Sequence, residues 1–393
     1  MLDHMQPFSL YLHIPFCRSR CTYCDFTTFA GVQYLIPDYV AALRCEIRYL
    51  AEITGERLPV HTVFFGGGTP SLLTTAQFSG ILNDLQMGFD IQNDAEISLE
   101  ANPGTVTLQS LKALRSIGFN RISFGVQSFH PQDLMLMGRI HEAIEALRVI
   151  SWARKAGFEN LNLDLIFGIP GQDMARWRQS LEIALGLKPD HISLYALTVE
   201  EGTPLFKWMN RGLIELIDDD LAAVMYELAD ERMEQVGLMP YEISNWGRPG
   251  MECRHNLQYW RMQPYLGFGA GAHGYVSGQR MANTGWIGDY IQRMRRVESC
   301  EFPFSPANER RTSLTRVDEM GEFMMVGLRL VREGVSFQEF LMRFGQPIVD
   351  VYGEQIEKLI HRQLLEIKPE DPDRIRLTRG GRLLGNQVFM EFI

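Results

Sequence analysis

The sequence predicts an α/β protein that folds as a partial (β/α)6 barrel and ends in a small helical, winged-helix-like domain. Two observations support this prediction. Short β-rich segments alternate with amphipathic helical segments between residues 10 and 197, and the pattern changes to helices and one hairpin after residue 305. Because strands that alternate with helices pair in parallel through right-handed crossovers, six such units form an open barrel.

Six segments are rich in β-branched and aromatic residues and are expected to be the strands. They cover residues 10–16, 62–65, 96–100, 121–126, 161–167 and 191–197. Apolar residues return every three to four positions in the expected helices 39–51, 108–117, 142–156 and 177–187. In barrels of this type the functional side chains follow the C-terminal ends of the strands.

The C-terminal part is expected to contain helices 318–332, 336–344 and 356–365, followed by a hairpin over residues 366–377. Residues 370–373, with the sequence Glu-Asp-Pro-Asp, are expected to form its turn. We therefore divide the chain into a barrel domain with its extension, 1–305, and a winged-helix-like domain, 306–393. Winged helices often bind DNA, but packing onto the barrel or onto a protein partner fits this acidic chain better.

Composition excludes two classes of function. With 38 Lys and Arg against 48 Asp and Glu, the formal net charge is −10, which repels phosphate backbones and argues against nucleic acid as a partner. No run of roughly twenty apolar residues offers a transmembrane segment. The sequence therefore predicts a globular protein whose contact with a membrane is peripheral or through another protein.

Cys17, Cys21 and Cys24 form a CxxxCxxC array directly after the first predicted strand. Thiolates suit an iron-sulfur cluster, and three of them within eight residues can hold one cluster while leaving one iron open. Structural zinc normally needs four protein ligands, and only His13 lies nearby to complete such a set. A disulfide scaffold is disfavoured because the chain has only six cysteines. Reduced thiols and an oxygen-sensitive cluster indicate the cytoplasm.

Polar and glycine residues recur where the other predicted strands end. The second strand runs into Gly66, Gly67, Gly68 and Thr69, whose backbone can approach a ligand closely. Glu100 ends the third strand, Gln127 follows the fourth, and Asp164 lies in the fifth. Each alone is equally well explained as a solvated strand-end residue, but together they are expected to line one rim.

Seven sequence motifs make the chain resemble the radical S-adenosylmethionine (SAM) superfamily, its anaerobic coproporphyrinogen III oxidase branch and, within that branch, the HemW family of heme chaperones. The motifs are YLHIPFC (11–17), CTYCDF (21–26), FGGGTP (65–70), FGVQSF (124–129), GRIH (138–141), HNLQYW (255–260) and LTRGGRLL (377–384). They extend over the whole chain, so the resemblance implies a radical SAM barrel with the branch's C-terminal domain.

The resemblance implies a 4Fe-4S cluster held by Cys17, Cys21 and Cys24, with SAM completing the coordination. The residues implied in SAM binding are Tyr11, Gly67, Gly68 and Thr69 at the methionyl end, Glu100 at the ribose, and Gln127, Arg139 and Asp164 at its remaining polar groups. The chemistry of these side chains agrees, because a carboxylate accepts hydrogen bonds from vicinal hydroxyls and arginine pairs with a carboxylate.

The HNLQYW motif implies heme binding through His255, Tyr259 and Trp260. Histidine is a common axial ligand of heme iron, and aromatic side chains supply an apolar surface for the porphyrin. Read without the family, the same residues fit a short helix capped by Asn256, with both aromatic side chains in the core. Cys253 is a second candidate ligand, since thiolates also bind heme iron.

Two functions of different classes follow from the resemblance. One is a heme chaperone that passes heme to respiratory proteins, at the inner face of the membrane, and needs a reductant for its cluster. The other is the oxygen-independent oxidase, which decarboxylates coproporphyrinogen III through a SAM-derived radical. Phe26 stands where the oxidases carry a further cysteine, and the oxidases also have a longer N-terminal extension, so the chaperone is favoured. A radical enzyme with another substrate remains the third alternative.

Overall fold

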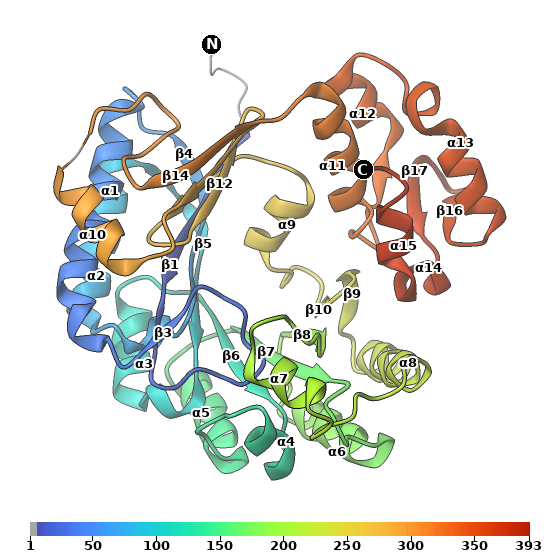
Figure 1. Cartoon of the computed structure of the whole chain (residues 1–393), viewed down its shortest axis with the longest axis horizontal. Helices are drawn as coiled ribbons and strands as arrows, with labels where there is room; N and C mark the ends of the chain where they lie inside the picture. Colours follow the sequence, from blue (N-terminus) through green and yellow to red (C-terminus); the bar gives the residue numbers. More distant parts are fainter. Residues whose placement is uncertain (1–5, 297) are drawn as a thin grey trace.

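The computed structural model describes residues 6–296 and 298–393. A twelve-stranded sheet runs through the larger part of these residues (Figure 1). Its middle contains six neighbouring parallel strands: β1 (Phe8–Ile14), β4 (Pro59–Gly67), β5 (Asp90–Ala101), β6 (Arg121–Gln127), β7 (Asn160–Phe167) and β8 (His191–Ala196). They are the six predicted strands in the predicted order, so the partial (β/α)6 barrel is confirmed.

Further strands extend the sheet on both sides of these six. Next to β1 lie β11 (Tyr265–Phe268), β12 (His273–Val276), β13 (Gln279–Asn283) and β14 (Asn308–Ser313); next to β8 lie β10 (Asn245–Gly247) and β9 (Met239–Glu242). β11 is parallel to β1, whereas the other added pairs are antiparallel. Because the sheet ends at β14 and β9, the barrel stays open. The sequence did not predict these strands, which are short and poor in regular alternation.

Long helices cover the outer face of the sheet (Figure 1). They are α1 (Ile36–Ile53), α2 (Thr75–Gly88), α3 (Leu108–Ser116), α5 (Ala143–Lys155), α6 (Met174–Gly186) and α8 (Asp219–Gln235). Shorter helices are α4 (Pro131–Leu136), α7 (Pro204–Asn210), α9 (Arg254–Trp260) and α10 (Ile287–Arg296), with 3-10 turns at Gln33–Leu35, Pro70–Leu72 and Pro103–Thr105. Within the described ranges, no helix is both long and apolar enough to cross a membrane.

Local chemistry explains where the predicted boundaries were wrong. The predicted strand 10–16 ends at Ile14, because Pro15 has no amide hydrogen for the ladder, and Phe16–Cys17 forms the separate strand β2 beside β3 (Phe29–Ala30). The predicted helix 177–187 begins earlier, at Met174, where the Asp173 side chain accepts a hydrogen bond from the amide of Arg176 at 2.8 Å.

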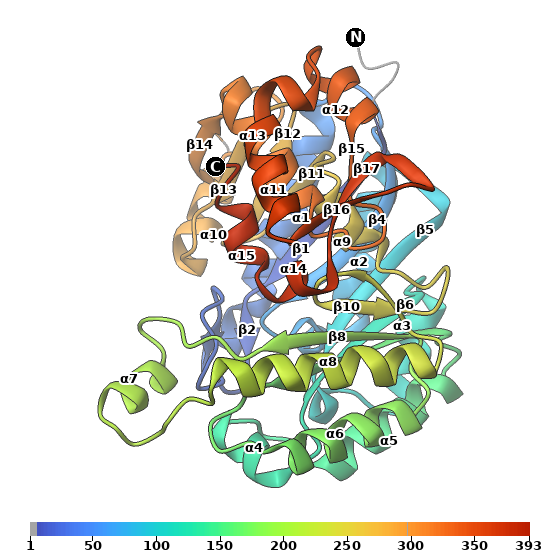
Figure 2. The same ribbon diagram turned by 90° about the vertical axis from the view of Figure 1, so that its right-hand side faces the viewer.

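The C-terminal residues form a second, smaller unit with the order helix, strand, two helices and hairpin. Its elements are α11 (Arg316–Gly327), β15 (Val335–Ser336), α12 (Phe337–Phe344), α13 (Ile348–His361), β16 (Leu365–Lys368), β17 (Asp371–Leu377), α14 (Arg379–Leu383) and α15 (Gly385–Phe389). This order agrees with the predicted winged-helix-like module (Figure 2). The unit has its own apolar core, which Met262 and Tyr275 join from the larger part. The division at residue 305 stays a prediction.

Three predicted boundaries in this unit were wrong. Helix 318–332 runs instead from Arg316 to Gly327. Helix 356–365 runs instead from Ile348 to His361, because Pro347 occupies its N-cap and Leu365 already belongs to β16. The turn predicted at 370–373 lies earlier, since Lys368 pairs with Asp371 and Asp371 begins β17.

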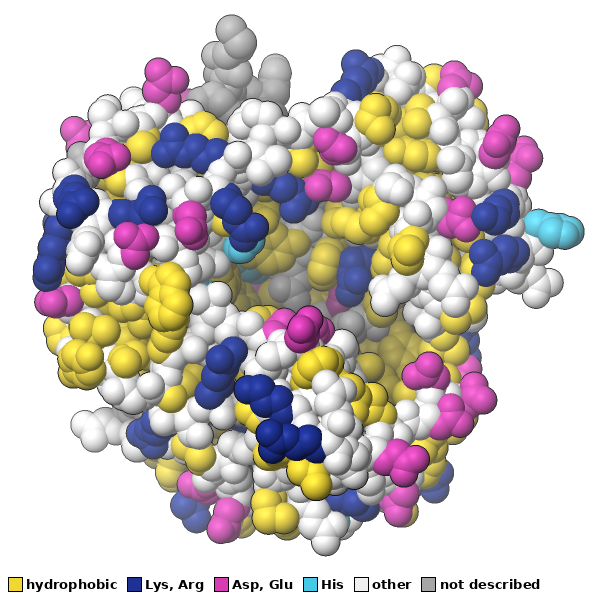
Figure 3. All heavy atoms as spheres, in the orientation of Figure 1, with side chains coloured by type: hydrophobic (Ala, Val, Ile, Leu, Met, Phe, Trp, Pro, Cys, Tyr) yellow, Lys and Arg dark blue, Asp and Glu magenta, His cyan; other side chains and the backbone are white. Residues whose placement is uncertain are grey.

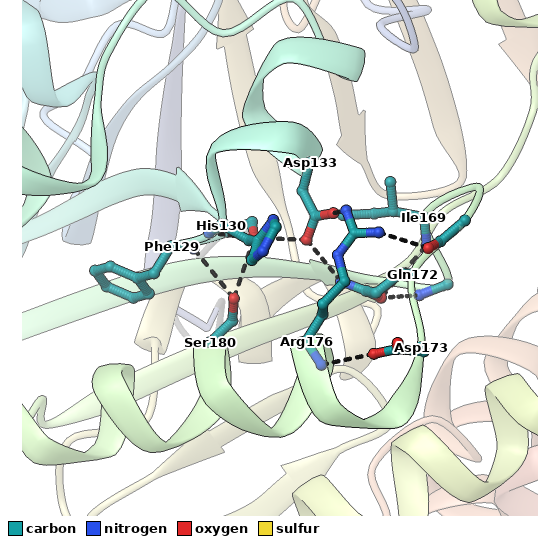
Figure 4. A network of polar contacts seen from close by, with 11 residues as sticks. Phe129, His130, Asp133, Ile169, Gln172, Asp173, Arg176 and Ser180 are labelled. Carbon is teal, nitrogen blue, oxygen red and sulfur yellow. Dashed lines mark hydrogen bonds and ion pairs between the residues drawn. The ribbon is translucent and has the colours of Figure 1, made fainter.

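A buried polar network fixes the segment between β6 and α5, which carries Arg139 (Figure 4). The Asp133 carboxylate on α4 accepts hydrogen bonds from Arg176 at 2.6 Å, Gln172 at 3.1 Å and Ser128 at 2.9 Å. Because Asp133 is buried, losing one of these partners would leave a desolvated charge, so the network locks α4 against α6 and the β7–α6 loop.

Candidate functional site

The strand ends surround a cavity of about 400 Å³ at the C-terminal edge of the parallel strands. Ten of the eleven residues predicted for the cluster and SAM line it, and Tyr11 is the exception. The ten are Cys17, Cys21, Cys24, Gly67, Gly68, Thr69, Glu100, Gln127, Arg139 and Asp164. These ten residues come from five strands and three loops far apart in the sequence. Their convergence is what the barrel topology predicts.

Tyr11 lies beneath the cavity and does not line it. Its hydroxyl donates a hydrogen bond to His13 Nδ1 at 2.9 Å, while His13 Nε2 donates to the carbonyl of Thr27 at 2.9 Å. Thr27 follows the third cysteine, so this chain of hydrogen bonds ties β1 to the end of the cysteine loop. Tyr11 therefore supports the site from below in this structure, and direct contact with SAM stays a prediction for this residue.

The cysteine loop joins β2 to β3, and each thiol has a polar neighbour. Thr69 Oγ1 lies 3.6 Å from Cys17 Sγ, and Arg139 Nη1 donates to Cys21 Sγ at 3.4 Å. Burial raises the pKa of the Cys17 and Cys24 thiols. All three cysteines are free thiols. Within the described residues, no three Cys, His, Asp or Glu side chains are already gathered as a metal-binding group.

The donor set nevertheless fits an iron-sulfur cluster. Three soft thiol ligands open into one cavity, and the Arg139 guanidinium donates a hydrogen bond to the sulfur of one of them, Cys21. Arg139 is held in place by the side chain of Asn102 at 2.5 Å and by the carbonyl of Gly125. Sequence reasoning missed Asn102, although its position two residues after Glu100 was a usable signal.

The glycine run needs glycine for steric reasons. Gly67 has a φ of 112°, and a Cβ at this position would lie 2.6 Å from the His13 ring. A Cβ on Gly68 would lie 2.7 Å from the carbonyl oxygen of Phe16. The run therefore packs directly against β2 and the start of the cysteine loop. Its small residues keep the backbone open to a ligand in the cavity.

Two carboxyl groups lie together on the wall of the cavity. Burial and the neighbouring Asp164 raise the pKa of Glu100 to about 8, although the amide of Gly67 donates to it at 3.0 Å. Burial also raises the pKa of Asp164, which accepts hydrogen bonds from Ser123 at 3.0 Å and Asn162 at 2.7 Å. Keeping two such groups side by side is unfavourable for stability and indicates a binding role.

Gln127 combines two features that favour a ligand-binding role. Its backbone is in the left-handed region, with a φ of 68°, which is strained for a residue with a side chain. Its Oε1 atom is buried and has no hydrogen-bond partner among the described residues. Buried polar atoms are normally paired, so this oxygen is suited to a donor group on a bound cofactor.

The HNLQYW motif lies on α9, away from this cavity. His255 is 1 % exposed, and both of its ring nitrogens are engaged, Nδ1 with Thr62 at 2.8 Å and Nε2 with Tyr259 at 2.8 Å. Desolvation lowers the pKa of His255 to about 3. Its ring stacks on Phe64, 5.0 Å between centroids. Neither nitrogen is available to an iron atom in this arrangement, so the predicted role of His255 stays untested.

The other residues of the predicted heme site have structural partners too. The guanidinium of Arg329 lies over the Trp260 ring at 4.5 Å and joins α9 to the segment that follows α11. Cys253, the second candidate ligand, is buried at the N-cap of α9, with Sγ 3.6 Å from Glu96. The predicted cap at Asn256 was wrong, because the helix already begins at Arg254.

Comparison with known proteins places the chain in a family. Residues 11–184 match the family model of the radical SAM superfamily, and residues 314–384 match that of the HemN C-terminal domain. The heme chaperone HemW of Mycobacterium tuberculosis is 43 % identical, over 98 % of this chain and 94 % of the relative. The chain belongs to the HemW family.

Two further comparisons agree with this assignment. The heme chaperone HemW of Bacillus subtilis is 36 % identical, over 98 % of this chain and 99 % of the relative. Among solved structures, coproporphyrinogen III oxidase HemN of Escherichia coli matches with a TM-score of 0.83 at 26 % identity, covering 99 % of this chain and 90 % of that chain. The HemW family thus shares the radical SAM fold and the C-terminal domain of the oxidase.

Proposed function

We propose that this protein is a heme chaperone that binds a 4Fe-4S cluster, SAM and heme, and that delivers heme to respiratory-chain proteins. The observation that supports it most is the full-length similarity to proteins named heme chaperone HemW, at 36 % and 43 % identity. The cavity supports the cofactor part of the proposal, because thiols, exposed glycine backbone and an unpaired amide oxygen meet there.

Cys17, Cys21 and Cys24 would hold the cluster, and Arg139 donates a hydrogen bond to the sulfur of Cys21. When bound, a reduced cluster supplies the electron for reductive cleavage of SAM in this superfamily. The chain's own residues would orient the cysteine loop and shield the cluster. The hydrogen bond from His13 to Thr27 restrains the loop, and Gly68 packs against the carbonyl of Phe16.

SAM would occupy the rest of the cavity. Glu100 is placed to accept hydrogen bonds from ribose hydroxyls once its carboxyl is ionised, and Gln127 Oε1 is free to accept one more. Gly67, Gly68 and Thr69 would receive the methionyl end. Arg139 and Asp164 would bind its remaining polar groups. Binding of the cationic sulfonium beside two carboxyls would also favour their ionised forms.

The oxygen-independent coproporphyrinogen III oxidase is the second candidate function. The similar fold of the HemN oxidase over 99 % of this chain favours it. Phe26 favours the chaperone, because it stands where the resembling oxidases carry a further cysteine. Its side chain is 63 % exposed and lines the cavity, so an apolar group occupies the entrance.

To deliver heme to respiratory proteins, this protein would act at the cytoplasmic side of the membrane. It would reach the membrane through a peripheral contact or through a partner protein. An external reductant for the cluster completes the set of proposed partners. Heme at His255, with Tyr259 and Trp260 beside it, requires that Tyr259 first release Nε2.

The test is an anaerobic heme titration of the cluster-reconstituted protein, followed by the Soret band, beside a parallel reaction with coproporphyrinogen III and SAM. The proposal predicts saturable heme uptake at one site and no protoporphyrinogen. Protoporphyrinogen formation without saturable heme uptake would establish the oxidase. His255→Ala tests the predicted ligand, and His361→Ala, which removes an exposed histidine on α13, is its matched control.

A further inference from the structure

A continuous chain of buried hydrogen bonds runs from the wall of the cavity proposed for SAM to the start of α9. At the cavity, Asp164 accepts from Nδ2 of Asn162 at 2.7 Å, and Oδ1 of Asn162 lies 2.6 Å from Nδ1 of His191. Nε2 of His191 lies 2.9 Å from the hydroxyl of Tyr241, whose oxygen accepts from the backbone amide of Cys253 at 3.3 Å. We call Asn162, His191 and Tyr241 the interior relay, and all three are buried.

Every hydrogen bond in this chain donates toward Asp164. The amide of Asn162 turns its Nδ2 to the Asp164 carboxyl, so its Oδ1 faces His191 and can only accept. Burial holds the pKa of His191 well below its ordinary value, so the ring is neutral and its one proton lies on Nδ1. Nε2 therefore accepts from the hydroxyl of Tyr241, and the Tyr241 oxygen is left to accept from the Cys253 amide. The direction of donation is thus the same along the whole chain.

The first turn of α9 is held by this chain and by one buried carboxylate. Glu96 on β5 accepts from the backbone amides of Arg254 at 3.1 Å and His255 at 3.4 Å. Amides at the N-terminus of a helix have no partner within the helix. Here the amides of Cys253, Arg254 and His255 all end on buried side chains of the barrel. A change at Tyr241 therefore acts directly on the start of the helix that carries the HNLQYW motif.

A buried arginine acts on both ends of the chain. Arg121, at the start of β6, is 2 % exposed, and its Nε has no hydrogen-bond partner among the described residues. Although burial opposes its charge, the neighbouring acidic groups Cys253, Glu96 and Asp164 raise the pKa of this guanidinium. In return, and against the effect of burial, its positive charge favours the ionised form of Asp164. Asp164 is thus placed to lose its proton when a further cation enters the cavity.

α9 lies where a large ligand can reach it. Figure 1 shows this helix in the middle of the molecule, between the sheet and the C-terminal unit, and Figure 3 shows the surface hollowed in the same region. Tyr259 is closed onto His255, with its hydroxyl 2.8 Å from Nε2. Heme binding at this motif requires that this contact opens. How firmly the barrel holds the first turn therefore decides how readily α9 can open.

We propose that the interior relay couples the cavity to α9, so that SAM bound beside Asp164 tightens the first turn of the helix and opposes heme binding there. The inference rests on the proposed function and adds its regulation. A cationic sulfonium near Asp164 favours the carboxylate, which accepts from Asn162 more strongly than a carboxylic acid does. Because hydrogen bonds in a chain polarise one another, the bond from Cys253 to Tyr241 strengthens as well. His191 and Tyr241 act through Asp164 and are positioning residues.

The coupling acts in both directions. SAM favours the closed α9 and heme favours the open one, so each ligand weakens the binding of the other by the same factor. We expect a factor of roughly five, at the lower end of the usual range, because the effect passes through a chain of hydrogen bonds rather than a direct contact. In a heme chaperone, the arrival of SAM would then promote the release of heme.

The first experiment follows hydrogen exchange by mass spectrometry in the anaerobic, cluster-reconstituted full chain, with and without SAM. The inference predicts that saturating SAM slows exchange in residues 251–258 by roughly threefold or more. Exchange in α13 is the internal reference and should not change, because that helix packs in the separate core of the C-terminal unit. Unchanged exchange in 251–258 with SAM bound overturns the inference alone. A parent that does not bind SAM overturns it together with the cofactor part of the proposed function.

Tyr241→Phe breaks the interior relay while keeping the ring. The variant should bind SAM within roughly threefold of the parent, but SAM should no longer slow exchange in 251–258. Tyr226→Phe is the matched control, because it removes another tyrosine hydroxyl, which donates to the carbonyl of Ile243 at 2.9 Å outside the relay. Its response to SAM should equal that of the parent. A parent-like response by Tyr241→Phe overturns the inference, and the parent measurement decides it even where this variant does not fold.

Heme titrations test the consequence for the second ligand. Followed by the Soret band, heme affinity of the parent should be roughly fivefold lower with saturating SAM, and SAM affinity should be lower by the same factor with heme. Both differences should vanish in Tyr241→Phe and persist in Tyr226→Phe. Independent affinities overturn the coupling and leave the chaperone proposal intact. A parent without saturable heme binding defeats the chaperone proposal, while the exchange experiment still decides whether SAM tightens α9.

Discussion

Glu100 allows the sharpest prediction, because it affects stability and binding in opposite directions. Its pKa of about 8, against an ordinary value of 4.5, means that the folded protein resists ionisation of this carboxyl. This difference between the two pKa values lowers the free energy of unfolding by at most about 5 kcal/mol at high pH. The side chain is only partly buried, so part of this cost is relieved by water in the cavity.

The sign follows from the two protonation states. Below pH 4.5 the carboxyl is neutral in both the folded and the unfolded protein, and its stabilising contribution is fully present. As pH rises toward 8, the unfolded chain loses its proton and the folded protein keeps it, so stability falls. Above pH 8 both states are ionised and the loss is complete.

Glu100→Gln removes this dependence while keeping an oxygen that accepts from Gly67. We expect the variant and the parent to have similar thermal midpoints near pH 5, and the variant to be more stable at pH 8.5. Its affinity for SAM should fall roughly tenfold or more, because a neutral amide accepts more weakly from the ribose hydroxyls. Glu56→Gln, at an exposed glutamate, is the control. A variant that is less stable than the parent at pH 8.5 would refute the reasoning.

Three further changes test separate parts of the site. Cys21→Ala should abolish iron and sulfide incorporation; a fully iron-loaded variant would contradict the cluster assignment. Gly68→Ala places a Cβ 2.7 Å from the Phe16 carbonyl oxygen, so SAM affinity measured by calorimetry should drop about tenfold, and parent-like affinity would contradict the packing argument. Glu46→Ala leaves the buried donors of Gly269, Asn283, Tyr290 and Ser305 without an acceptor, and should lower the unfolding free energy by about 3 kcal/mol in denaturant titrations; a loss below 1 kcal/mol would contradict it.

The barrel could be predicted from sequence because its signal is local. Each parallel strand is buried on both faces and reads as a short apolar run, and each intervening helix carries an amphipathic pattern. The strand ends then locate Glu100, Gln127 and Asp164 without any knowledge of side-chain contacts. The cysteine array is equally local, since its three ligands lie within one loop.

The extension of the sheet could not be predicted in the same way. Strands β11 to β14 gain their pairing from residues far away in sequence, and Gly267 or Ala282 carry no strand preference of their own. The contacts that surround His255 could not be predicted from the sequence either. Its burial depends on Thr62, almost two hundred residues earlier, and on the packing of Tyr259 against the same ring.

Transfer of heme tests the central claim most directly. The protein would be loaded with one equivalent of heme, freed of excess, and mixed anaerobically with a heme-depleted respiratory protein, with recovery of the acceptor's heme spectrum followed over time. The account predicts faster and more complete recovery than with the same amount of free heme. Recovery no better than with free heme would contradict the proposal that this chain is a heme chaperone.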